Sequence, residues 1–174
     1  MAPANDLPFG WVAGAPPADT LPMREHHHPT GGFTLPVPEG WEVAENVSGC
    51  AMVVSEPAYG PYFTPNVVLT IEPWTDGESL DAWVDRSRDA LRESLNRLRV
   101  IDVEETTVAG LPARRTLSHY LHEQHGGVNL EQWSLARDGY GYVISVSCAA
   151  LEYDEMHDLS RRTVEGLRFQ GAAP

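Results

Sequence analysis

The sequence predicts an α+β domain of an α/β/α-like kind: a twisted antiparallel sheet with a long helix inserted mid-sequence and a second helix at the C-terminal end. Several short segments alternate apolar with polar residues, which is the spacing of half-buried strands. Residues 79–98 and 154–167 instead repeat their apolar residues at helical spacing. Short turns, such as Asp138-Gly139, separate consecutive strands, so we expect neighbouring strands to pair antiparallel.

The predicted strands form one group before the long helix and one group after it. The first group covers residues 33–38, 41–43, 50–55 and 66–72, and the second covers residues 100–108, 114–121, 128–137 and 142–149. Residues 33–38 are expected to be an edge strand, because proline cannot donate to a ladder of hydrogen bonds. In residues 66–72, three apolar side chains face one way and leave Val68 and Thr70 on the other side.

Each predicted helix has one apolar stripe and a polar residue suited to its start. Ser79 is the predicted N-cap of the first helix, and Asp154 of the second. Two such helices can together cover one face of the sheet. The other face would then carry Thr70, Ser145 and Ser147, and would be solvated or serve as a docking surface.

The domain organisation follows from a change in composition near residue 30. Residues 1–30 are rich in proline, alanine and glycine and are interpreted as an N-terminal arm. Residues 31–170 form a single domain, and residues 171–174 form a tail. The tract His26-His27-His28 ends the arm; it could chelate a transition metal, but we interpret it as incidental.

Composition excludes some classes of function. The chain has 25 acidic residues against 12 Lys and Arg, which gives a net charge of −13 and disfavours binding to nucleic acid. The same charge serves solubility and would favour a basic protein partner. No secretory signal and no apolar run of about 18 residues is recognised, so we expect a cytoplasmic protein without membrane insertion.

Three histidines are the candidate metal ligands. His119, His122 and His125 follow one another at intervals of three, with Glu123 between them. On a strand this interval puts His119 and His122 on opposite faces, and His122 meets His125 only if the chain curls between them. A metal protein or small enzyme that uses these histidines is therefore the alternative hypothesis. No nucleophile elbow, phosphate loop or dinucleotide fingerprint appears, and no cofactor is expected.

The loop at residues 56–65 and the two cysteines complete the candidates. Tyr59, Tyr62 and Phe63 are residue types enriched at interaction hot spots, although Phe63 is equally suited to cap the core. Cys50 and Cys148 are too few for a disulfide framework. Both occupy inward strand positions, where buried thiols are usually inert.

Several short motifs, in order, resemble those of one family. Residues 33–41 (FTLPVPEGW) resemble the opening of LpqN-type actinobacterial proteins and their PsbP-like relatives. Residues 63–67 (FTPNV) resemble that family's entry into the strand before the long helix, and residues 110–113 (GLPA) its hairpin after the helix. The closing strand at residues 142–147 and the helix ending in Arg168-Phe169 also fit, so the resemblance covers about residues 31–169.

The resemblance implies binding rather than catalysis. Relatives include a Ran-binding nuclear-transport factor, a photosystem extrinsic subunit, mycobacterial lipoproteins and chaperones for secretion effectors, and no shared catalytic residue accompanies the fold. We therefore expect a non-catalytic protein-binding module, an adaptor or chaperone linked to actinobacterial secretion or envelope biology. The candidate partner-binding residues are Tyr59, Tyr62, Phe63, Thr70, Ser145 and Ser147. A structural homodimer joined through the open sheet face is a further alternative.

Overall fold

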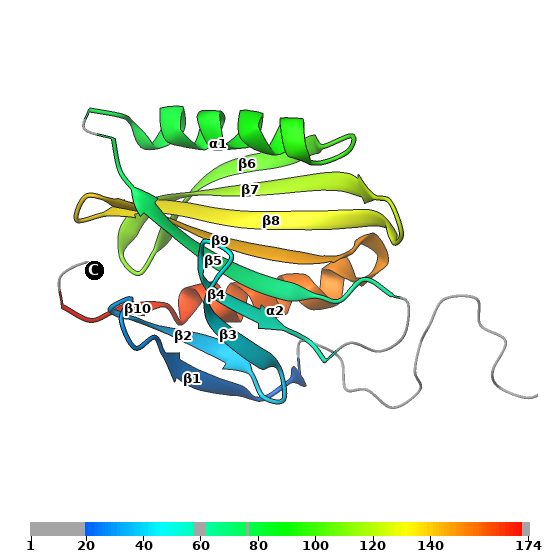
Figure 1. Ribbon diagram of the computed structural model, residues 1–174, viewed down its shortest axis with the longest axis horizontal. Helices are drawn as coiled ribbons and strands as arrows, with labels where there is room; N and C mark the ends of the chain where they lie inside the picture. Colours follow the sequence, from blue (N-terminus) through cyan, green and yellow to red (C-terminus); the bar gives the residue numbers. More distant parts are fainter. Residues whose placement is uncertain (1–19, 58–61, 76, 172–174) are drawn as a thin grey trace, which may run out of the picture.

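The computed structural model describes residues 20–57, 62–75 and 77–171, which form two sheets and two α-helices (Figure 1). In the large sheet every neighbouring pair of strands is antiparallel. The strands of the large sheet are, in spatial order, β3 (Glu42–Val47), β4 (Cys50–Ser55), β5 (Asn66–Pro73), β9 (Tyr140–Ala149), β8 (Gly126–Arg137), β7 (Leu111–His122) and β6 (Arg99–Val108). The structure thus confirms a mainly antiparallel α+β fold with one helix mid-chain and one near the C-terminus.

The small sheet consists of β1 (Met23–His27), β2 (Phe33–Pro38) and β10 (Arg168–Phe169). Its central strand is β2, so the expectation of an edge strand at residues 33–38 was wrong. The prolines do not prevent this second pairing, because β10 is short and pairs only with the start of β2, before either proline. Beyond that point β1 is the only neighbour of β2 among the described residues, and Pro36 and Pro38 are tolerated on the free side of the strand.

The two helices lie on opposite faces of the large sheet, which corrects the expectation that both cover one face. Helix α2 (Tyr153–Glu165) shares the main core with Ile144 and its cross-strand partner Leu69. The loop that follows helix α1 (Leu80–Ser94) packs with the helix on the opposite side, where Tyr120 pairs with Val128. Strands β7 and β8 carry apolar residues on this second side too, and they give α1 a small core of its own. We call these sides the α2 face and the α1 face.

The main core lies on the α2 face, between the large sheet, helix α2 and the small sheet. Figure 1 shows α2 and the small sheet on the same side of the large sheet, away from α1. The bulkiest fully buried side chains of the chain, most of them in this core, are Trp83, Tyr142, Phe33, Leu35, Met52, Leu69, Leu135, Ile144, Leu159 and Leu167. Because the small sheet and α2 cover this face together, the α2 face leaves little room for a partner.

The helix ends follow local chemistry. The Ser79 hydroxyl accepts a hydrogen bond from the Ala82 amide at 3.1 Å, which confirms Ser79 as the N-cap of α1. The helix stops at Ser94, one turn earlier than predicted, because Leu95 is extended with φ −107° and ψ 125°.

The start of α2 differs from the prediction. A 3-10 turn, η2 (Ala150–Glu152), leads directly into the helix, and the N-cap Glu152 makes no side-chain capping bond. The prediction of Asp154 as the N-cap was therefore wrong, and Asp154 lies in the first turn, where its charge favours the helix dipole. Within the described part of the chain, neither helix is long and apolar enough to cross a membrane.

Candidate functional site

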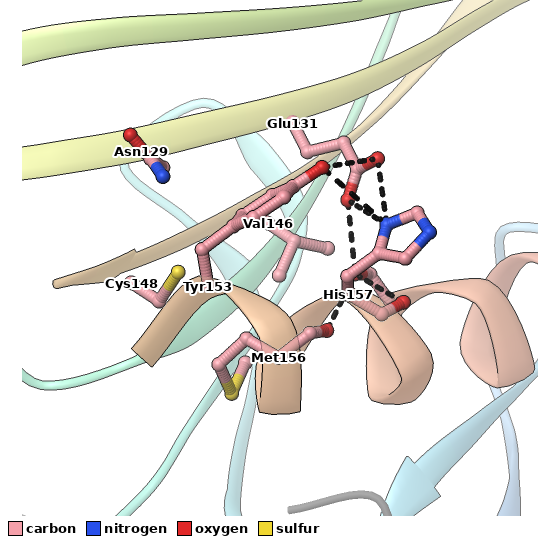
Figure 2. A pocket seen from close by; sticks show the side chains of 8 residues that line it. Asn129, Glu131, Val146, Cys148, Tyr153, Met156 and His157 are labelled. Carbon is pink, nitrogen blue, oxygen red and sulfur yellow. Dashed lines mark hydrogen bonds and ion pairs between the residues drawn. The ribbon is translucent and has the colours of Figure 1, made fainter. Parts of the chain in front are cut away.

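A polar cluster beneath helix α2 contains the most deeply buried acidic side chain, that of Glu131 on β8 (Figure 2). Only 2% of Glu131 is exposed, on the α2 face of the sheet. Its carboxylate accepts hydrogen bonds from Arg115 Nε at 2.5 Å and from the Ser160 hydroxyl at 3.2 Å. His157 Nδ1 lies 3.2 Å from the carboxylate and the Tyr153 hydroxyl lies 3.5 Å from it.

Electrostatics in this cluster favour one charged pair and one neutral phenol. Burial would lower the pKa of the Arg115 guanidinium, but the neighbouring Glu131 carboxylate outweighs this effect. The pKa is therefore raised overall, and Arg115 stays charged. Burial, followed by the negative charge of Glu131, raises the pKa of Tyr153 to about 12. The phenol therefore remains a neutral donor at physiological pH.

The cluster is organised as a structural tie and lacks the geometry of a catalytic triad. The Ser160 hydroxyl bonds to Glu131 and to the backbone carbonyls of Met156 and His157, and makes no bond to the His157 ring. Figure 2 shows Tyr153 and His157 of α2 directed towards Glu131, and the pocket that these residues line has no room even for a water molecule. The cluster therefore anchors α2 to strands β7 and β8.

The cysteines occupy the same face. Cys148 is buried, and burial, followed by the charges of Glu152 and Glu131, raises its pKa to about 12. The thiol therefore stays protonated, as expected for an inert cysteine. Cys50 is half-buried at the start of β4, and both thiols are free.

The three predicted metal ligands are not brought together. His119 lies on the α2 face, with Nδ1 at 2.9 Å from Asn129 Oδ1. His122 and His125 do converge, with ring centroids 4.6 Å apart, and both contact the ring of Phe63. In the described parts of the chain no group of three His, Cys, Asp or Glu residues could hold a metal ion.

The tract His26-His27-His28 has structural partners that its composition does not reveal. The first histidine contacts Glu45 at 2.6 Å and the second contacts Thr34 at 2.8 Å. His28 is buried, with Nε2 at 2.9 Å from the Ala51 carbonyl oxygen and its ring stacked on a phenylalanine. Part of this tract lies in β1, within the stretch expected to be an arm.

The predicted polar residues of the sheet come together on the α1 face. Thr70 pairs with Val143, Val68 with Ser145, and Asn66 with Ser147. Helix α1 packs over β7 and β8, its Trp83 reaches the end of β5 and β9, and the part of the face between stays half-exposed. We call the open half the nine half-buried, uncharged residues of this region, which are Val53, Ser55, Asn66, Val68, Thr70, Gln132, Val143, Ser145 and Ser147.

The aromatic loop divides between packing and exposure. Phe63 packs against the small core under α1, beside Leu91 and Tyr120, which supports its role as a cap on that core. Tyr62 is 53% exposed and stays a candidate for recognition. Tyr59 lies outside the described residues.

Two tryptophans flank the end of strands β5 and β9; Trp83 lies on the apolar stripe predicted for its helix, but its contacts with Trp74 and Glu72 were not predicted. Trp83 Nε1 donates to Glu72 Oε1 at 2.6 Å, and the ring of Trp83 lies 5.1 Å from that of Trp74. A Cβ at Gly141 would lie 2.5 Å from the Trp83 ring, so this close packing requires glycine. The available signal was a glycine inside an otherwise apolar strand.

Comparisons with known proteins show the fold and nothing finer. No protein-family model matches the chain, and no curated protein matches it. Cyanobacterial PsbP from Synechocystis superposes with a TM-score of 0.66 at 13% identity, over 93% of this chain and 99% of that one. LpqN of Mycobacterium tuberculosis, described as involved in cell envelope biogenesis, gives 0.63 at 16% identity, over 87% and 92%. The Ran-binding protein Mog1p of Saccharomyces cerevisiae gives 0.62 at 12% identity, over 86% and 96%.

These likenesses support a PsbP- and Mog1-like fold for the chain. The sequence-based resemblance to PsbP-like proteins is therefore confirmed at the level of the fold. The narrower assignment to LpqN-type actinobacterial proteins stays a prediction, because identities this low speak for the fold alone.

Proposed function

We propose that this protein is a non-catalytic protein-binding module, an adaptor or chaperone, whose partner docks on the open half of the α1 face. The single observation that carries the proposal is a set of nine neighbouring, half-buried residues on one side of the sheet that carry no charge, although Glu42 and Glu72 border them on the same face. Charged residues make up 21% of the sequence, whereas on β5 and β9 this region holds its carboxylate at the margin, where Glu72 binds Trp83; exposed Glu42 lies opposite Ser55. Depletion of charged residues marks the centres of protein interfaces.

The side chains of the open half suit a protein partner. Alternating valine with serine and threonine offers apolar contact together with hydroxyl groups, one of which, on Ser145, accepts a bond from Gln132 at 3.0 Å. A helix or extended segment with an apolar side could lie across β5 and β9 beside α1. A binding function agrees with the Ran-binding neighbour Mog1p, and a link to envelope biology would follow LpqN. The cytoplasmic location stays a prediction.

The test places a long cation in the middle of the open half. Thr70→Arg changes a half-exposed side chain on β5, and Ala90→Arg adds the same charge at an exposed position on α1. The partner is first captured from the source cells and purified, and is then titrated against each variant. Thr70→Arg should lose binding of this partner, and Ala90→Arg should keep it. Equal affinity of the partner for both variants would contradict the proposal.

The same material separates this proposal from a homodimer. Analytical ultracentrifugation of the wild type and of Thr70→Arg reports whether the open half joins two copies. A dimer that dissociates only in Thr70→Arg would assign the open half to self-association and overturn the proposed docking of another protein.

A further inference from the structure

Strand β6 forms one edge of the large sheet. Among the described residues β7 is its only paired neighbour, so one side of this ten-residue strand presents backbone groups that no strand pairs. An edge of this length can accept a further strand through main-chain hydrogen bonds. The question is which kind of strand its side chains admit.

The side chains of β6 combine exposed apolar and acidic groups. Ile101 is 58% exposed and Val103 is 43% exposed, and both rank among the exposed large hydrophobic residues of the described chain. The register shifts between Val100 and Asp102, which makes Ile101 the bulged residue. Val103 pairs with Thr116 and so lies on the α1 face.

Acidic side chains of β6 outnumber the cations that contact them. Asp102 and Glu104 lie on the α2 face, at 3.3 and 3.5 Å from the Arg115 guanidinium, which also binds Glu131. One cation therefore serves three carboxylates. On the α1 face, Glu105 shares its arginine with a further aspartate, so this side also carries excess negative charge.

We propose that β6 accepts a basic, extended segment of a partner protein by strand addition. A segment that alternates basic and apolar residues would set its cations opposite Asp102 and Glu104 and an apolar side chain opposite Val103. Opposite charges on directly paired strands stabilise the pairing. The two carboxylates thus specify the charge of the partner, and the exposed valine specifies its spacing.

The same charges disfavour a second copy of this chain as the occupant. Antiparallel pairing of two β6 strands about Val103 would put Asp102 of each copy opposite Glu104 of the other. Like charges directly opposite are destabilising, so self-pairing in this register is disfavoured. The edge of β6 is separate from the open half. An experiment that contradicts strand addition therefore leaves the proposed function untouched, and the reverse also holds.

The test is a titration between the purified full chain and a fluorescein-labelled peptide of eight alternating lysines and valines. The fluorescence anisotropy of the peptide measures its binding. The double variant Asp102→Asn with Glu104→Gln should weaken binding about tenfold. The control removes two exposed carboxylates from α1, by Asp85→Asn with Asp89→Asn, and should leave the affinity within about twofold. Equal losses in both double variants would mean attraction to net charge alone and would overturn the proposal.

Two further measurements decide whether a strand is added. A peptide of the same charge with proline in place of its central valines should lose binding, and the intact peptide should slow hydrogen exchange at β6 amides. Equal binding of the proline peptide would overturn strand addition. If the double variant fails to fold, Ile101→Lys replaces it in the test. This change lies at an exposed position and should also weaken binding. A dimer in ultracentrifugation that Val103→Lys dissociates would assign the edge to a second copy instead.

Discussion

The two faces of the large sheet differ although the same strands build both. On β9, Ile144 points to the α2 face and is fully buried, while its neighbour Ser145 points to the α1 face and is half-exposed. The α2 face is closed by a helix and a second sheet, whereas helix α1 covers β7, β8 and the end of β5 and β9, and leaves the rest of the α1 face half-exposed. The closed face therefore supplies the stability of the fold, and the open half is left free for recognition. If so, equal substitutions on the two faces should differ strongly in their cost.

The largest expected difference concerns two adjacent arginines on β7. Arg115→Leu removes the cation beside the buried Glu131, and we expect it to lower the free energy of unfolding by about 3–5 kcal/mol. Arg114→Leu is the matched control, because the carboxylates that it contacts are exposed; it should cost far less than Arg115→Leu. Urea unfolding at pH 7 measures both.

The same arginine offers a check on the cause. Replacing Arg115 and Glu131 together by leucine leaves no unpaired buried carboxylate, because Asp102 and Glu104 are exposed, so the double variant should be more stable than Arg115→Leu alone. Equal costs for the two arginine variants would remove the distinction between a buried pair under α2 and surface pairs at α1. A double variant less stable than Arg115→Leu would show that Glu131 stabilises the fold without its arginine.

The second difference separates core from open half on one strand. Ile144→Ala deletes a fully buried side chain and should lower the free energy of unfolding by about 2–5 kcal/mol. Ser145→Ala loses one hydroxyl contact to Gln132 at a half-exposed position and should cost less than about 1 kcal/mol. Urea unfolding of the pair is the measurement, and a Ser145→Ala cost that matches Ile144→Ala would mean that the open half belongs to the core.

Much of this architecture was predictable, because strand alternation and helical spacing are local signals. Residues 33–38 and 50–55 were predicted with the observed boundaries, and Ser79 was correctly predicted as a cap. The alternation also separated Val68 and Thr70 from the core side of β5. The placement of the helices was not predictable in this way, because Tyr120 and Val128 reveal a second apolar patch only when β7 and β8 are paired.

The sites were less accessible to sequence reasoning than the fold. The Glu131 cluster joins residues 115, 131 and 153–160, and no short motif announces contacts over such separations. His122 and His125 meet because the hairpin curls, which their spacing left open. The exposure of β6 depends on its place at the sheet edge, which its sequence alone does not state.

The smallest expected effect is a dependence of the closed face on alkaline pH. Burial raises the pKa of Tyr153 from 10.0 in an exposed reference to about 12, so the unfolded phenol ionises at lower pH than the folded one. This contribution to stability is complete below about pH 10 and is lost as pH rises towards 12. Between pH 9 and pH 11 the wild type should therefore lose about 1 kcal/mol more than Tyr153→Phe, by urea unfolding at each pH. Ser145→Ala, on the open half, should lose as much as the wild type, and parallel losses in all three proteins would show that Tyr153 is not the group responsible.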